Sequence, residues 1–220
     1  VVSTTVDTAD RGSAEFQSQR KVFTMADITE TVDVTVSPYV ASGGALSIKP
    51  SGGTNTIDAA ASCSVIMGGT TNTLESPLSF IGSGVGNTVP VCGTNIAIVA
   101  ANDSTIVRNA LNISNLFIGA GFNLDMNGRS NSAIVSGANH CMTAASNSFI
   151  GAGSNSKTTQ SNTFIGTGFN NCVCGTGSGV VTGSNNSISG SSSFIGAGNS
   201  HCIASTGCAS VIAGGSGNCI

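Results

Sequence analysis

The feature that most constrains this chain is a short internal repeat in its last two thirds. The pentapeptide Phe-Ile-Gly-Ala-Gly, or a version with one substitution, occurs five times, at residues 80–84, 117–121, 149–153, 164–168 and 194–198. Weaker copies begin at Val65, Ala97, Ala133, Gly179 and Val211. The ten units start 15 to 20 residues apart. A unit this short cannot bury a core alone, so neighbouring units must stack and share one.

Two columns of the repeat are apolar. We count the first residue of each unit as position zero. Position one is β-branched in every unit, and its residues are Ile66, Ile81, Ile98, Ile118, Ile134, Ile150, Ile165, Val180, Ile195 and Ile212. Position nine is apolar in all units but one, and its residues are Leu74, Val89, Ile106, Met126, Met142, Thr158, Val173, Ile188, Ile203 and Ile220. Two apolar columns predict two core-facing strands in each unit.

Glycine and asparagine separate the two apolar columns. Gly occupies position four in nine units, and Asn occupies position six or seven in most of them. Both residue types tolerate the positive φ that a sharp corner requires. The sequence therefore predicts an all-β fold, a β-solenoid or β-roll of about ten coils of 15–17 residues. Each coil has two short strands, and the position-one column forms the structural core.

Positions zero and two compensate for each other in volume. Where position zero is Phe, position two is Gly, and where position zero is Ala or Gly, position two is Val. Residues two apart on a strand share a face, so this second face holds a nearly constant volume, as close packing demands. We predict that a partner subunit covers it, and the alternative is cover by the chain's own N-terminal segment. Its aromatic residues are Phe80, Phe117, Phe149, Phe164 and Phe194.

The chain is expected to divide into three parts. Residues 1–45 do not repeat, and they form a polar arm or anchor with one half-buried strand at residues 28–36. Residues 46–64 form a degenerate capping coil with Ile57 at position nine, because terminal repeats are often atypical. Residues 65–220 are the solenoid. Since the last residues stop within a repeat, a longer parent chain is expected.

The sparse charges argue against a nucleic-acid partner, and the short apolar runs argue against a membrane span. Charged residues are only 8% of the chain, the net charge is −3, and none follows Lys157. Binding to nucleic acid needs a cluster of phosphate-neutralising cations, so we expect no nucleic-acid partner. No apolar run approaches the roughly 20 residues of a membrane helix, so no membrane span is expected.

Residues suited to metal binding or catalysis are sparse in this sequence. The two histidines, His140 and His201, each precede a Cys and occupy matching positions four coils apart. At the usual strand spacing that separation is about 19 Å, too far to share one ion. The glycine-rich units lack the lysine and the following helix of a phosphate loop. We therefore expect no metal site, no cofactor and no enzymatic activity. The best place for any binding loop is the insertion around residues 107–116, with Arg108 and Asn109.

Cysteines recur at position eight of four units. Cys202 and Cys219 occupy this position in adjacent coils, and they form a disulfide if the Cα spacing reaches the usual range. Cys141 and Cys172 are two coils apart and are expected to be too distant to pair. The alternative for the whole column, which we slightly prefer, is free thiols that act as small stacking residues.

The units resemble those of two groups of surface proteins. Ser193-Phe194-Ile195-Gly196, preceded by Asn186-Ser187-Ile188, resembles the short repeats of trimeric autotransporter adhesin heads. It resembles even more the repeat-rich fibre and appendage proteins of marine phages and algal viruses. The resemblance covers about residues 60–220. It implies a trimeric, extracellular solenoid or β-roll on a virion or cell surface.

Three functions are weighed from these observations. The first is a structural fibre, spike or appendage subunit that joins a larger virion or filament through its N-terminal arm, with contact to a host as an additional role. The second is a secreted adhesin that binds a host surface glycan. The third is an ice-binding solenoid, which needs a flat and regular Thr-rich face. That face is interrupted, because the Thr residues of position eight give way to Asp, Lys, Ser and Cys in later units.

Overall fold

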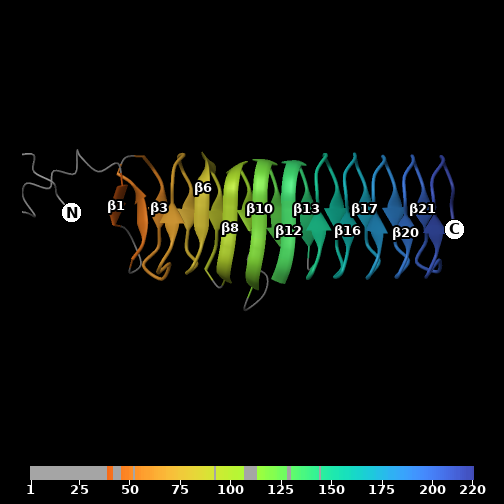
Figure 1. Cartoon of the computed structure of the whole chain (residues 1–220), viewed down its shortest axis with the longest axis horizontal. Helices are drawn as coiled ribbons and strands as arrows, with labels where there is room; N and C mark the ends of the chain where they lie inside the picture. Colours follow the sequence, from red (N-terminus) through yellow and green to blue (C-terminus); the bar gives the residue numbers. More distant parts are fainter. Residues whose placement is uncertain are drawn as a thin grey trace, which may run out of the picture. The chain divides into compact units, whose positions relative to one another are not determined.

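The structure of the chain is a computed structural model that describes residues 39–41, 46–51, 53–91, 93–106, 113–127, 130–143 and 145–220. The described residues contain strands and turns and no helix. The predicted β-solenoid is confirmed, because successive coils lie side by side and build two sheets (Figure 1). The strand predicted at residues 28–36 and the proposed binding residues Arg108 and Asn109 lie outside the described residues.

The first sheet has twelve strands, and all but one of them are parallel. The exception, β1, pairs antiparallel with β2 at the N-terminal edge. The strands are β1 (Tyr39–Ala41), β2 (Ile48–Pro50), β4 (Val65–Ile66), β6 (Phe80–Val85), β8 (Gly93–Asn102), β10 (Ile113–Phe122), β12 (Ser130–Ala138), β14 (Phe149–Ile150), β16 (Phe164–Ile165), β18 (Gly179–Val180), β20 (Phe194–Ile195) and β22 (Val211–Ile212).

The second sheet has ten strands and runs in the same order along the coils. Its strands are β3 (Thr56–Ile57), β5 (Thr73–Leu74), β7 (Thr88–Val89), β9 (Thr105–Ile106), β11 (Asp125–Asn127), β13 (Cys141–Thr143), β15 (Lys157–Thr158), β17 (Cys172–Val173), β19 (Ser187–Ile188) and β21 (Cys202–Ile203). Each coil thus contributes one strand to each sheet, and the core lies between the sheets.

The coils stack in register, so equivalent residues of the repeat lie next to one another. Ile150 pairs with Ile165 in the first sheet, and Ile57 pairs with Leu74 in the second. Every position-one residue from Ile66 to Ile212 is buried, and so are the position-nine residues from Leu74 to Ile203. Each such aliphatic side chain contributes roughly 1.5–3 kcal/mol of burial free energy. The two columns together are the core.

The strands of the middle coils are longer than the sequence predicts. β8 and β10 each have ten residues and β12 has nine, whereas most other strands have two. Ile96 and Leu116 stand just before position zero, where most other coils have Ser or Thr, and both are buried. This apolar residue extends the core-facing side of the strand, and the longer coils give it a partner in register.

Corners of the coil depend on residues in the left-handed region. Position six has positive φ in all ten units, as in Asn170 with φ of 52°, and Asn is the residue after Gly that best tolerates this conformation. Gly168 at position four has φ of 121°, and a β-carbon there would lie 2.0 Å from the carbonyl oxygen of Gly183. Ala101, the one exception at position four, lies within β8 and does not have positive φ.

A ladder of buried polar side chains lies inside one corner, at position seven. Asn171 shows its chemistry: its Nδ2 donates to the carbonyl oxygens of Thr167 and Gly183, at 3.4 and 2.9 Å. Its Oδ1 accepts the backbone N–H of Asn186 at 3.1 Å. A buried amide without partners costs free energy, whereas this one is satisfied on both sides. The ladder therefore ties neighbouring coils together through the core, with an interruption at Leu124, the one apolar residue at position seven.

Candidate functional surface on the first sheet

The outer face of the first sheet presents one continuous row of apolar side chains, from positions zero and two of successive coils. Phe117, Phe149, Phe164 and Phe194 are 36–41% exposed, while Phe80 is half-buried. We call the row the apolar strip, and its exposed members are Met67, Val99, Phe117, Val135, Phe149, Phe164, Val181, Phe194 and Val211. The position-one residues between them point inward, so both faces of these strands are apolar.

The Phe and Gly residues of one coil are in direct contact. A β-carbon added at Gly166 would lie 3.4 Å from Cε1 of the Phe164 ring, so the ring covers the glycine. The same β-carbon would lie only 2.3 Å from the carbonyl oxygen of Val181 in the next coil. Gly therefore accompanies Phe for two reasons. A β-carbon would collide with the backbone of the next coil, and, as the sequence predicts, the side-chain volume on this face stays nearly constant.

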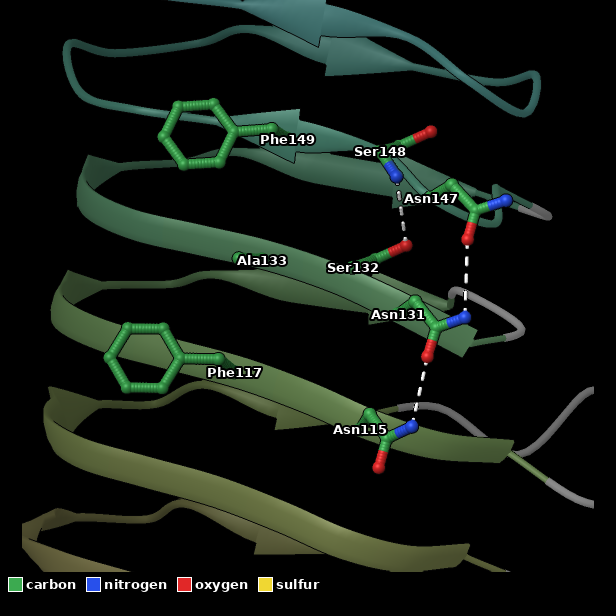
Figure 2. Close-up of a pocket in the computed structure, with 8 residues that line it drawn as sticks. All are labelled: Asn115, Phe117, Asn131, Ser132, Ala133, Asn147, Ser148 and Phe149. Atoms are coloured by element: carbon green, nitrogen blue, oxygen red, sulfur yellow. Dashed lines mark hydrogen bonds between the residues drawn. The ribbon is translucent and has the colours of Figure 1, made fainter.

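Ring packing along the apolar strip varies with the residue at position zero. Phe149 and Phe164 occupy adjacent coils and stack, with ring centroids 5.6 Å apart and ring planes within 8°. Where Ala133 separates Phe117 from Phe149, the strip has no ring between them, and a hollow of about 440 Å³ opens on the surface (Figure 2). The strip is therefore a series of ridges and gaps rather than a smooth band.

A ladder of exposed asparagines borders this hollow. Asn115, Asn131 and Asn147 stand two residues before position zero, each with φ between 52° and 56°. The Nδ2 of Asn115 donates to Oδ1 of Asn131 at 2.9 Å, and the Nδ2 of Asn131 donates to Oδ1 of Asn147 at 3.2 Å (Figure 2). Each exposed amide keeps a second N–H for a ligand or for water. Apolar rings and amides thus meet along one edge of the hollow.

Both histidines lie in the inner polar ladder. His140 and His201 are each 1% exposed at position seven, and each Nδ1 accepts a backbone N–H from the following coil, that of Ser156 or Asn218, at 3.1 Å. Burial lowers the pKa of His140. Nδ1 of these rings takes the place of Oδ1 of the asparagines elsewhere in the ladder, whereas the buried Nε2 of each ring has no hydrogen-bond partner among the described residues. Among the described residues, no group of three or more His, Cys, Asp or Glu side chains is placed to hold a metal ion.

The cysteines of position eight point outward from the second sheet. Cys202 and Cys219 are paired across adjacent coils, and both thiols are free in this structure. Lys157 lies between Cys141 and Cys172 in the order of the coils. A contact that the sequence does not predict joins Cys172 to Cys174, whose sulfur atoms are 3.0 Å apart.

The sequence pattern alone does not distinguish the asparagines at position six from those at position seven. Position six carries the exposed corner asparagines, whereas position seven carries the buried ladder. The exposed ladder before position zero was also missed. Its signal is present in the sequence, as Asn recurs at that position in five consecutive units, at residues 95, 115, 131, 147 and 162.

Comparisons with known proteins assign no family. No family model matches the chain, and no curated protein matches it. Within the described ranges, no helix is long and apolar enough to cross a membrane. The features that bear on function are therefore the apolar strip and the ladders beside it.

Proposed function

We propose that this chain is a structural rod subunit that associates with copies of itself through the apolar strip. The assembly is a homotrimer that serves as a fibre, spike or appendage on the outside of a virion or cell. Residues 1–45 attach it to the larger structure, and its surface contacts a host. The observation that supports this proposal is a continuous apolar face on a sheet whose opposite face already builds the core.

The size of the apolar strip supports burial against a partner. Its nine side chains are about two-fifths exposed on average, which leaves on the order of 700 Å² of apolar surface if each offers about 150–200 Å² in full. The largest apolar patch on a monomer is usually ~300–600 Å². A standard interface buries about 800 Å² on each partner. The strip is therefore large enough to hold copies together.

The form of the strip favours a copy of this chain as the partner. Its ridges repeat at the coil spacing of about 4.8 Å, and a second copy presents ridges and gaps with the same spacing. Eleven parallel strands in the first sheet extend for about 48 Å, so two copies can meet along many coils. When three copies surround one axis, each strip can contact two others. The chain carries few charges, so charge repulsion between the copies is weak.

Imaging and localisation test the structural role. Negative-stain images of the purified chain are expected to show rods thicker than one solenoid. Antibodies against the chain are expected to label virions, filaments or surface appendages from the source. Purified particles and appendages that contain none of this chain would contradict the proposal.

A glycan-binding adhesin is the second candidate, favoured by the hollow beside Ala133. Phe117 and Phe149 flank it, and the amides of Asn131 and Asn147 border it. Aromatic faces and amide groups together suit a sugar ring, because they supply an apolar surface and hydrogen bonds. A glycan array tests this candidate with the double variant Ala133→Phe, Val135→Gly, which gives this coil the Phe–Gly pair of other coils and fills the gap with a ring. Binding that this double variant abolishes would favour the adhesin over the structural subunit.

A further inference from the structure

Two thiols touch on the outer face of the second sheet. Cys172 lies in β17 and Cys174 follows that strand, so both side chains leave the same face. Their Sγ atoms are 3.0 Å apart and share a hydrogen bond. A disulfide has an S–S length of about 2.05 Å, so the sulfurs need to approach by only about 1 Å. Both residues are half-buried and therefore still meet solvent.

The neighbouring coils give this pair a natural comparison. Cys141 and Thr143 occupy the same two positions in β13, and there the Cys141 thiol contacts the Thr143 hydroxyl at 3.3 Å. One site therefore has two thiols and the other has a thiol and a hydroxyl in matching geometry. Lys157, the neighbour of Cys172 in β15, brings a positive charge toward the dithiol.

We propose that Cys172 and Cys174 form a redox-active dithiol that reacts with small disulfide oxidants such as oxidised glutathione. One thiolate attacks the S–S bond of the oxidant, forms a mixed disulfide and releases one reduced thiol. The second thiolate then attacks the protein sulfur of the mixed disulfide and releases the other. The protein loses two electrons and two protons, and one molecule of oxidant becomes two thiols. A strong reductant reverses the reaction.

The surroundings set the order of the two steps. Burial, together with the hydrogen bond and the charge of Cys174, raises the pKa of Cys172 to about 12. Cys172 is therefore a thiol at neutral pH, and Cys174 makes the first attack. In the mixed disulfide, Cys174 has neither a thiol hydrogen bond nor a charge to raise the pKa of Cys172, so Cys172 can then complete the bridge.

The test compares the full-length chain with Cys174→Thr, which copies the Cys141 site and should fold. Folded protein is incubated with oxidised glutathione at pH 8, free thiols are blocked with N-ethylmaleimide, and peptides are weighed by mass spectrometry. In the unmodified sequence, the peptide with residues 172–174 is expected to lack both adducts and to weigh 2 Da less than its dithiol form, since two hydrogens are lost. In Cys174→Thr, Cys172 is expected to carry maleimide or glutathione, as Cys141 does in both proteins.

A second variant tests the order of attack. Cys172→Thr is expected to stop at a mixed disulfide on Cys174, formed at least about tenfold faster than the mixed disulfide on Cys172 in Cys174→Thr. Two maleimides on the 172–174 peptide after oxidation would overturn the proposal. So would glutathione on both sulfurs, or a bridge from Cys172 to another cysteine. Peptide masses of the unmodified chain show by themselves whether the disulfide between Cys172 and Cys174 forms, so the test still holds if a variant fails to fold.

Discussion

The ring of Phe164 lies over Gly166 on the same strand face, and the backbone of the next coil comes closer still to this glycine. A β-carbon at Gly166 would meet the carbonyl oxygen of Val181 at 2.3 Å and the ring at 3.4 Å. The ring edge can shift, whereas a carbonyl held in a stack of coils cannot. The glycine of each Phe unit is therefore fixed more by coil stacking than by the size of the ring.

This contact predicts the cost of a methyl group. Gly166→Ala should destabilise the chain by about 2 kcal/mol or more, because the coil must move away from Val181. Thr167→Ala at the next, exposed residue is the control and should stay within about 0.5 kcal/mol. Urea unfolding measures both. If Phe164→Ala in the double variant restored full stability to Gly166→Ala, ring volume would be the cause instead.

The buried ladder predicts a specific tolerance at position seven. Asn171→Ala removes the donors to Thr167 and Gly183 and the acceptor for Asn186, which should cost about 2–3 kcal/mol. Asn171→His should cost less, because Nδ1 of His140 and of His201 accepts the equivalent backbone N–H, although the Nε2 of neither ring has a hydrogen-bond partner. Thermal or urea unfolding distinguishes the two. Equal losses for both variants would show that the ring does not replace the amide in the ladder.

Acid should weaken the core at His140. Nδ1 of the imidazole must stay unprotonated to accept the Ser156 N–H, and burial lowers the pKa of His140 below the usual histidine value of about 6.5. The unfolded chain therefore binds a proton more readily than the folded chain. Stability is full above about pH 6.5 and falls as the pH drops below that value toward the folded pKa.

The matched variant for this prediction is His140→Asn, the residue found at position seven in five other coils. Urea unfolding at pH 5 and pH 7.5 should show a smaller loss in acid for His140→Asn than for the unmodified chain. Burial raises the pKa of the nearby Asp125, which has the opposite effect on the pH dependence of stability. The difference between the two proteins isolates the histidine. An identical pH dependence of the free energy of unfolding in the two proteins would show that protonation of His140 does not weaken the fold.

The bridge between Cys202 and Cys219 stays a prediction. The two residues are direct partners in adjacent parallel coils, a spacing of about 4.8 Å that lies within the Cα range of disulfides. Oxidation that closes the 17-residue span between them should add about 3 kcal/mol to the free energy of unfolding. Non-reducing peptide mapping detects the bridge, and Cys219→Ser is the control. Both thiols fully alkylated after oxidation would favour the alternative of free stacking residues.

The repeat made much of the fold predictable because each coil repeats the same physical constraints. A β-branched residue occupies position one in all ten units and Gly follows at position four in nine of them, so an atypical residue in one unit does not obscure the pattern. Ile165 and Val173 are core residues for reasons visible in sequence. The long strands β8 and β10 were not predictable, because they depend on the apolar residues Ile96 and Leu116 finding partners in register across coils.

The surface was less predictable than the core. Alternation places Phe149 and Phe164 outward, but their stacking and the hollow beside Ala133 depend on the alignment of adjacent coils. The contact between Cys172 and Cys174 depends on how the chain bends after β17. No sequence pattern favours that pair over Cys202 and Cys219, because the 3.0 Å approach of the two sulfur atoms arises only in the folded chain.

Sedimentation equilibrium of the purified chain at micromolar concentration tests the central claim most directly. Self-association through the apolar strip predicts a mass three times that of one chain. It also predicts that Phe149→Ser with Phe164→Ser shifts the mass toward the monomer, while Lys157→Ser on the other sheet does not. A well-folded protein with the mass of a single chain at every concentration would contradict the claim.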